Sequence, residues 1–237
     1  MRIDLITSSF NSNIHWLDNM RGIDNIYLYE KSDNNIPPSD LNLITKKLIN
    51  IGCEHQSYVQ HIVDNYDDLA DINIFTQADP FPHIATSKES FYNIVKAKNY
   101  YKFSSGYIDL TGGFLISDIY GRTSVKERFI LNCKSFCSKF DITIPDYLFL
   151  FQTNGIFGAT KNCIHSISRD KWRSINNYIK ESCTVVNSNR GIDYLWVSDS
   201  VYIMERMWFN LLNRDNKLPE NYKMNKNIHP YGYSRFI

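Results

Sequence analysis

Short apolar runs alternate with amphipathic stretches along the first eighty residues of the chain. Residues 2–8, 25–29 and 72–76 are rich in Ile, Leu, Tyr and Phe, which is typical of buried β-strands. Between them, residues 14–20 and 54–68 place apolar side chains at helical spacing. This alternation of strand and helix predicts an α/β fold in which several strands run parallel.

The rest of the chain continues the mixture without an obvious boundary. Helices are expected at 87–98, 125–140, 169–181 and 199–212. A strand is expected at 154–160, a strand or a core turn at 147–151, and a strand pair or a loop at 107–117. No repeat, low-complexity segment or clear linker interrupts the chain, so residues 1–237 are expected to form one domain.

The composition excludes several classes of protein. The formal net charge is +1, which provides no field for bulk nucleic-acid binding, so no nucleic-acid partner is expected. The N-terminus lacks the apolar region of a signal peptide, and the longest apolar run, 147–151, is too short to span a bilayer. The five irregularly spaced cysteines favour reduced thiols over disulfides or a zinc site. We therefore expect a cytoplasmic protein, with peripheral association at the inner face of the membrane left open.

The polar cluster that follows strand 72–76 holds the most distinctive candidate chemistry. Gln77, Asp79 and His83 come directly after the strand, and two prolines stiffen the turn between them. Ligands of open α/β sheets bind beyond the carboxyl ends of the strands. The sequence therefore predicts that these three side chains face a cleft, and the alternative is a polar loop with no catalytic or binding task.

Familiar nucleotide and hydrolase motifs are absent. The chain has no G-x-G-x-x-G after its first strand, no P-loop, no G-x-S-x-G elbow, no H-E-x-x-H and no C-x-x-C. An acidic and an amide group at a strand end are instead the layout of GT-A nucleotide-sugar transferases, in which carboxylates hold a divalent ion on the diphosphate. Here Gln77-Ala78-Asp79 supplies one carboxylate, so Asp79 is the expected ligand of Mn²⁺ or Mg²⁺ and the binding is expected to be weak.

Motifs spread over most of the chain carry a family resemblance. They include Asn50-x-Gly52-x-Glu54, Tyr58-x-x-His61-Ile62, Asn65-Tyr66-Asp67-x-Leu69, Phe75-Thr-Gln77-x-x-Pro80-Phe81-x-His83 and Met204-Glu205-Arg206-Met207-Trp208. In these motifs the chain resembles a family of short GT-A glycosyltransferase-like proteins of bacteria and fungi, long labelled a domain of unknown function. The chain departs from the family pattern at Glu30 and Ala78, where an amide and a glycine are expected.

The resemblance implies a fold and an activity. The fold would be a single GT-A-like, Rossmann-like α/β domain with a mixed, mainly parallel sheet flanked by helices. The activity would be transfer of a sugar from a nucleotide-activated donor to a saccharide acceptor, in surface polysaccharide biosynthesis. Segment 154–159 would contribute to the acceptor side.

The resemblance also implies roles for individual residues. Asp79, Glu205 and His83 would be catalytic, with Glu205 acting as a base on the acceptor hydroxyl or orienting its neighbour. Donor binding would fall to Gln77, Lys31, Glu54, His61 and Arg206.

Structural roles for these residues remain open. His61 lies on an apolar helix face and is equally typical of a core histidine. Glu54 suits the first turn of a helix through the helix dipole. Glu205 and Arg206, as sequence neighbours, could each form a separate structural ion pair.

Two other functions compete with glycosyl transfer. A non-catalytic module that binds nucleotide sugars or glycans is motivated by the missing second carboxylate at Gln77. A hydrolase or other transferase would use His61 or His83 together with Asp79.

Overall fold

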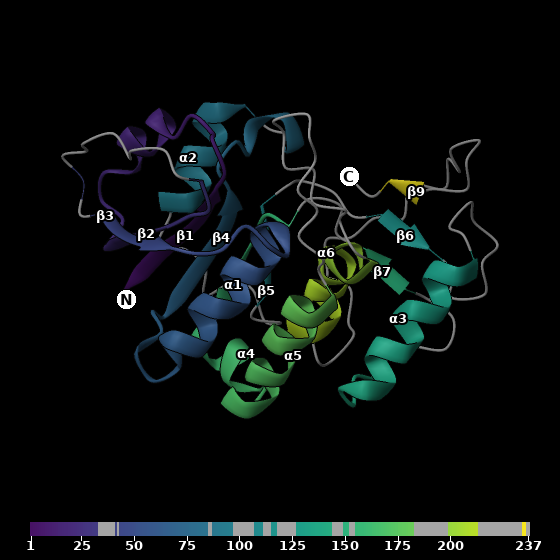
Figure 1. Cartoon of the computed structure of the whole chain (residues 1–237). Helices are drawn as coiled ribbons and strands as arrows, with labels where there is room; N and C mark the ends of the chain where they lie inside the picture. The colour runs from purple at the N-terminus through teal and green to yellow at the C-terminus, as the bar shows by residue number, and fades with distance from the viewer. Residues whose placement is uncertain are drawn as a thin grey trace, which may run out of the picture.

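The computed structural model describes residues 1–32, 41, 43–84, 87–96, 107–110, 115–117, 127–143, 149–151, 155–182, 199–212 and 234–235 (Figure 1). Its main sheet has six strands in the order β3-β2-β1-β4-β8-β5. The strands are β1 (Ile3–Ser9), β2 (Asn25–Glu30), β3 (Leu43–Lys47), β4 (Ile72–Gln77), β5 (Tyr107–Asp109) and β8 (Phe157–Thr160). Neighbouring strands from β3 to β4 are parallel, whereas β8 is antiparallel to β4 and β5. The expected α/β fold with a mixed, mainly parallel sheet is confirmed.

Strand β1 lies in the middle of the parallel part of the sheet. All seven of its residues are buried, because it has a strand on each side and helices above and below. The chain continues from β1 to β2 and β3 on one side and then returns to β4 on the other. The register places Ser9 opposite Glu30 and Ser8 opposite Gln77, so three strands end at one edge of the sheet.

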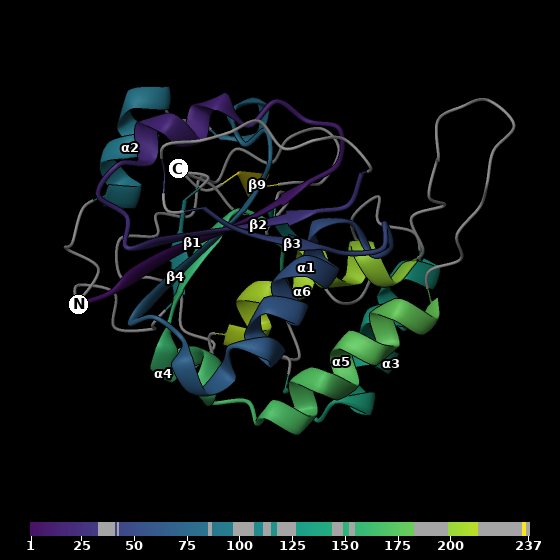
Figure 2. The same ribbon diagram turned by 60° about the vertical axis from the view of Figure 1, so that its left-hand side comes forward.

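Helices cover both faces of the sheet, as Figure 2 shows. Helix α1 (Cys53–Asp64) packs on β1 and is joined by α5 (Arg169–Ser182) and α6 (Asp199–Leu212). The 3₁₀-helix η1 (His15–Met20) and α2 (Lys88–Lys96) lie together over the opposite face. The side chains of β1 alternate between the two layers: Ile6 joins the α1 side and Leu5 joins the η1 side.

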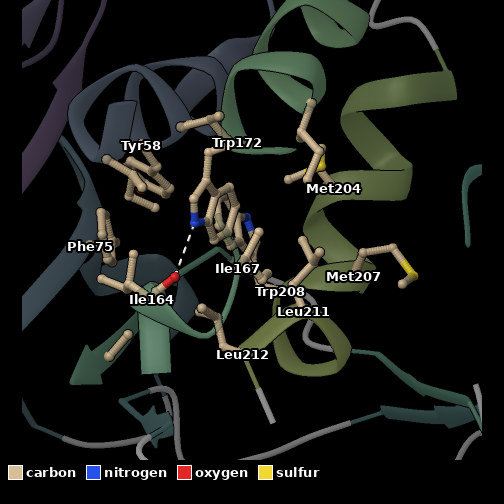
Figure 3. Packing of buried hydrophobic residues seen from close by; sticks show 14 of the residues in the cluster. Tyr58, Phe75, Ile164, Ile167, Trp172, Met204, Met207, Trp208, Leu211 and Leu212 are labelled. Carbon is tan, nitrogen blue, oxygen red and sulfur yellow. Dashed lines mark hydrogen bonds between the residues drawn. The ribbon is translucent and has the colours of Figure 1, made fainter. Parts of the chain in front are cut away.

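Large aromatic side chains fill the α1 side of the core (Figure 3). The Phe75 and Phe157 rings stack at 5.0 Å across β4 and β8, and Trp208 lies 4.9 Å from Phe157. Trp172 is fully buried, and its Nε1 donates a hydrogen bond of 3.1 Å to the carbonyl of Ile164. The buried indole thereby keeps a hydrogen-bond partner, which limits the cost of desolvating its polar group.

A smaller antiparallel sheet lies beside α6. It contains β6 (Leu115–Ser117) between β7 (Phe149–Phe151) and β9 (Ser234–Arg235), and α3 (Glu127–Lys139) packs on α6 nearby. The expectation for 107–117 is therefore corrected: β5 and β6 both form, but they pair in different sheets.

Other elements were not anticipated from the sequence. Strand β3 ends in two lysines and lies at the sheet edge, so its apolar pattern is weak. Helix α4 (Lys161–His165) is a single short turn that Thr160 caps through a hydrogen bond from the Cys163 amide. Of the five cysteines, Cys53, Cys133, Cys137 and Cys163 are free thiols, and Cys183 lies outside the described residues.

No helix within the described ranges has both the length and the apolar character needed to cross a bilayer.

Candidate functional site

The converging ends of β1, β2 and β4 open into a cavity of about 400 Å³, called here the strand-edge pocket. It lies at the carboxyl edge of the parallel strands, between β1 and β4. The chain runs from β1 to β2 and β3 on one side of β1 and then returns to β4 on the other side. This is where open α/β sheets bind ligands. Its lining residues are Ser8, Ser9, Phe10, Ser12, Lys31, Asn50, Cys53, Glu54, Gln77, Ala78, Asp79, Pro82 and His83.

The three polar residues that follow strand β4 all line this pocket. Gln77 is the last residue of β4 and is half-buried, whereas Asp79 and His83 are exposed. His83 belongs to η3 (Phe81–His83), a 3₁₀ turn in which its amide donates a hydrogen bond of 3.0 Å to the carbonyl of Pro80. The turn folds the chain back, which returns the imidazole to the cavity that Gln77 and Asp79 line.

A second cavity of about 580 Å³ adjoins the first. Ser12 and Asp79 line both cavities, so Asp79 stands on their shared wall. We call this second cavity the aromatic cavity. Its other lining residues are Asn13, His15, Trp16, Asn19, Phe81, Lys88 and Tyr92. Trp16 and Phe81 meet edge to face at 5.7 Å, and Phe81 meets Tyr92 in the same way at 5.8 Å. Sequence reasoning missed this cavity, because its rings come from segments after two different strands.

Hydroxyl groups and an ammonium group gather in the strand-edge pocket near the start of α1. Lys31 is buried, and its Nζ donates a hydrogen bond of 2.6 Å to the carbonyl of Ile51 and another to the carbonyl of Cys53. Ser8 Oγ and Ser57 Oγ lie 2.9 Å apart in a hydrogen bond. Ser9 is 2% exposed, and its Oγ has no hydrogen-bond partner among the described residues. A buried hydroxyl without a partner is costly, and a ligand atom in the pocket would satisfy it.

Glu54 also faces this pocket, from the first turn of α1. Gly52 precedes the helix with φ 64°, and no side chain caps the helix start. The Glu54 side chain is 22% exposed and lies 3.8 Å from His55 Nε2. The Glu54 carboxylate lies in the first turn of α1, where the helix dipole favours a negative charge. The same carboxylate also lines the cavity.

His61 lies apart from the pocket, in the core. It is 1% exposed, and its Nδ1 is 3.0 Å from the hydroxyl of Tyr29. Burial lowers its pKa to about 3, because the charged imidazolium is poorly solvated there. His61 is therefore the core histidine that the sequence left open as an alternative. The hypothesis that His61 acts together with Asp79 as a catalytic pair is wrong, because Asp79 lines both cavities and His61 lines neither.

The two site residues predicted on α6 are Glu205 and Arg206. Glu205 is half-buried and is not among the described residues that line the two cavities. The side chain of Arg206 lies outside the described part of the chain.

Segment 154–159, which is expected to contribute to the acceptor side, packs partly in the core and partly against α1. Residue 154 lies outside the described residues, while Ile156 and Phe157 are fully buried. Gly155 lies against the start of α1, beside His55.

The carboxylates in the described part of the chain do not form an all-protein metal cage. Among the described residues, no three His, Cys, Asp or Glu side chains are grouped to hold an ion. The oxygen donors of Asp79 and Gln77 are nevertheless of the type that Mg²⁺ and Mn²⁺ accept. Mg²⁺ is often held by one or two carboxylates together with substrate phosphates, so these residues fit an ion that arrives with a diphosphate.

Comparison with known proteins places the chain in a family without assigning it an activity. No curated protein matches the chain significantly. Residues 5–225 match one family, which covers the strands that form the pocket and most of the chain beyond them. The family's description gives no activity and does not mention glycosyl transfer. The chain belongs to the family described as "Protein of unknown function (DUF3431)".

Proposed function

We propose that the protein is a glycosyltransferase that moves a sugar from a nucleotide-activated donor to a saccharide acceptor. The position of Asp79 on the wall shared by two adjoining cavities carries this proposal. Group transfer requires two substrates to meet at one point, and a carboxylate between two cavities marks such a point. The resemblance to GT-A-like proteins supports the same function.

The strand-edge pocket suits the donor. Its hydroxyls at Ser8 and Ser9, with the ammonium of Lys31 nearby, are groups that bind phosphate oxygens. Its volume of about 400 Å³ falls in the range of small-molecule sites. Gln77 and His83 would contact the diphosphate or the donor sugar.

The aromatic cavity suits the acceptor. The rings of Trp16, Phe81 and Tyr92 provide apolar surfaces for the C–H groups of a sugar ring. The amides of Asn13 and Asn19 offer both donors and acceptors for its hydroxyl groups.

The reaction would be a displacement at the anomeric carbon of the donor sugar. Lys31 and the hydroxyls would stabilise the negative charge that develops on the departing diphosphate. Mn²⁺ or Mg²⁺, when bound, would offset the same charge, and Asp79 would hold it. Surface polysaccharide assembly at the cytoplasmic face of a membrane is the setting that we propose.

A thermal-shift screen tests donor binding directly. The panel contains UDP, GDP, UDP-glucose, UDP-N-acetylglucosamine and GDP-mannose, each with Mg²⁺, with Mn²⁺ and with EDTA. A ligand that binds only the folded protein raises the melting temperature, and one nucleotide class is expected to do so. The shift should disappear in Asp79→Asn and persist in Asp170→Asn, whose exposed carboxylate lies on α5 away from both cavities.

Turnover separates the transferase from a binding module. Release of free nucleoside diphosphate from the bound nucleotide sugar, accelerated by added saccharide, is the expected result. Binding without any release would favour the non-catalytic module, and the absence of any shift across the panel would overturn the proposal.

A further inference from the structure

A line of buried side chains connects α6 to the strand-edge pocket. Trp208 Nε1 on α6 donates a hydrogen bond of 3.1 Å to Nδ1 of His55 on α1. On the other side of the same imidazole, Nε2 lies 3.8 Å from Glu54 Oε1. Trp208 is fully buried and His55 is 1% exposed, whereas Glu54 reaches the pocket. The line therefore starts in the core and ends at a carboxylate that a ligand could touch.

The hydrogen bond from Trp208 determines the protonation of His55. An indole N–H can only donate, so Nδ1 must offer a lone pair. The imidazole is then neutral and carries its proton on Nε2, the nitrogen that faces Glu54. His55 thus presents an N–H group to the carboxylate without placing a positive charge beside it.

Gly155 packs against the His55 imidazole, beside Glu54. Its φ is +55°, and a Cβ at this position would lie 2.8 Å from His55 Cε1 and 3.5 Å from Glu54 Oε1. A side chain would therefore push against the imidazole. The backbone at 155 packs directly on the ring, which restricts His55 to its position between Trp208 and Glu54.

The Glu54 carboxylate has no cationic side chain paired with it in the described part of the chain. His55 is the one group within 4 Å ion-pair distance, and no hydrogen bond to the carboxylate oxygens is found there. Lys31 Nζ, the ammonium group that lines the same pocket, donates hydrogen bonds to the carbonyls of Ile51 and Cys53. A partly buried carboxylate with a neutral neighbour remains able to accept a proton from a substrate.

We infer that Glu54, in place of Glu205, is the catalytic base of the transfer, and that His55 is the residue that positions it. This inference rests on the proposed function. The acceptor hydroxyl enters the strand-edge pocket from the aromatic cavity, past Asp79 on their shared wall. Glu54 takes its proton there while the acceptor oxygen forms a bond to the anomeric carbon. The bond from that carbon to the diphosphate oxygen breaks, and its electron pair leaves with the nucleoside diphosphate. Direct attack in this way inverts the configuration at the anomeric carbon.

The test compares Glu54→Gln with two other glutamate variants. Glu181→Gln, at an exposed site near the end of α5, is the matched control, and Glu205→Gln represents the rival base. Each variant is assayed for melting temperature, for the thermal shift with the nucleotide sugar of the panel that binds the wild type, and for nucleoside diphosphate release. The other titratable groups lining the pocket, Lys31, Cys53, Asp79 and His83, are unchanged in all three.

Glu54→Gln should keep the melting temperature and the nucleotide-sugar shift and lose about 10² to 10⁴ in the rate constant kcat. Retention of the rate within about threefold in Glu54→Gln, or a comparable loss confined to Glu205→Gln, would overturn the inference while the proposed function stands. If the wild type binds no nucleotide sugar of the panel, the proposed function and the inference fall together. Should Glu54→Gln not fold, Glu54→Asp decides, since withdrawing the carboxylate by one methylene should still cut kcat at least tenfold.

The positioning role of His55 has its own readout. Imidazole ¹⁵N shifts should show an unprotonated Nδ1 and a protonated Nε2 in the wild type. His55→Gln should lower kcat with little change in KM for the donor, and it should move the acidic limb of the pH–rate profile. A purely structural role would lower the melting temperature and leave that limb in place, and this result would overturn the assignment.

Discussion

The indole Nε1 of Trp16 donates a hydrogen bond of 2.5 Å to the carbonyl oxygen of Ala78. Trp16 lies on η1, which follows β1, while Ala78 lies between Gln77 and Asp79 in the loop after β4. One buried contact therefore connects the two chain segments that line both cavities. It restricts the loop that carries Asp79.

Replacing Trp16 by Phe should loosen that loop. The variant keeps an aromatic ring but leaves the Ala78 carbonyl without its donor, which should cost about 1–3 kcal/mol of unfolding free energy. Urea denaturation measures this cost, and the nucleotide-sugar shift should weaken in parallel. Unchanged stability and unchanged binding would show that the hydrogen bond does not restrain Asp79.

A side chain at Gly52 should be unfavourable for two reasons: the backbone has a positive φ, and an added Cβ would clash with neighbouring side chains. Its φ is +64°, and a Cβ there would lie 2.5 Å from Ile179 Cγ2 and 2.6 Å from Gln56 Cβ. Gly52→Ala should therefore destabilise the fold by about 2 kcal/mol or more. Gly22→Ala is the control, since Gly22 has φ +98° with nothing within 4 Å of the added methyl. Equal losses in the two variants would mean that backbone strain alone matters.

His61 should make the protein less stable in mild acid. Its folded pKa is about 3, below the ordinary value of 6.5, so the unfolded chain binds the proton first as the pH falls. Its contribution to stability is complete above pH 6.5 and is lost progressively between pH 6.5 and 3. From pH 7 to pH 5 the unfolding free energy should fall by about 2 kcal/mol from this residue.

The variant His61→Gln isolates that effect. It removes the titrating group, so its unfolding free energy should change less between pH 7 and pH 5, although its stability at pH 7 should be lower because Tyr29 loses its partner. Denaturant titrations of both proteins at the two pH values provide the comparison. An identical pH dependence in the two proteins would contradict the assignment of His61 as a neutral core residue.

Tyr92 tests the assignment of the aromatic cavity to the acceptor. Tyr92→Ala removes one ring of that cavity and leaves the residues of the strand-edge pocket in place. The acceptor KM should rise about tenfold, from loss of the ring surface, while the donor thermal shift stays unchanged. A weakened donor shift with an unchanged acceptor KM would reverse the roles of the two cavities.

Local sequence patterns determined much of the fold and one part of the site. The apolar runs of β1, β2 and β4 and the helical spacing of α1 predicted an α/β sheet, because alternating apolar patterns specify element type through burial. The polar residues after β4 predicted a cleft, since strand ends in such sheets open to solvent. The structure places Gln77, Asp79 and His83 together in the strand-edge pocket.

Only the tertiary structure decided which distant segments complete the site. His61 and His55 are both histidines of α1, yet packing against Tyr29 keeps the first in the core and packing against Trp208 aims the second at Glu54. Trp208 lies 153 residues from His55 in the sequence, so the pattern of neighbouring residues could not predict the hydrogen bond between them. The spacing of apolar residues along an element predicts which of its side chains are buried. The residue that each buried side chain contacts depends on how whole helices pack on the sheet.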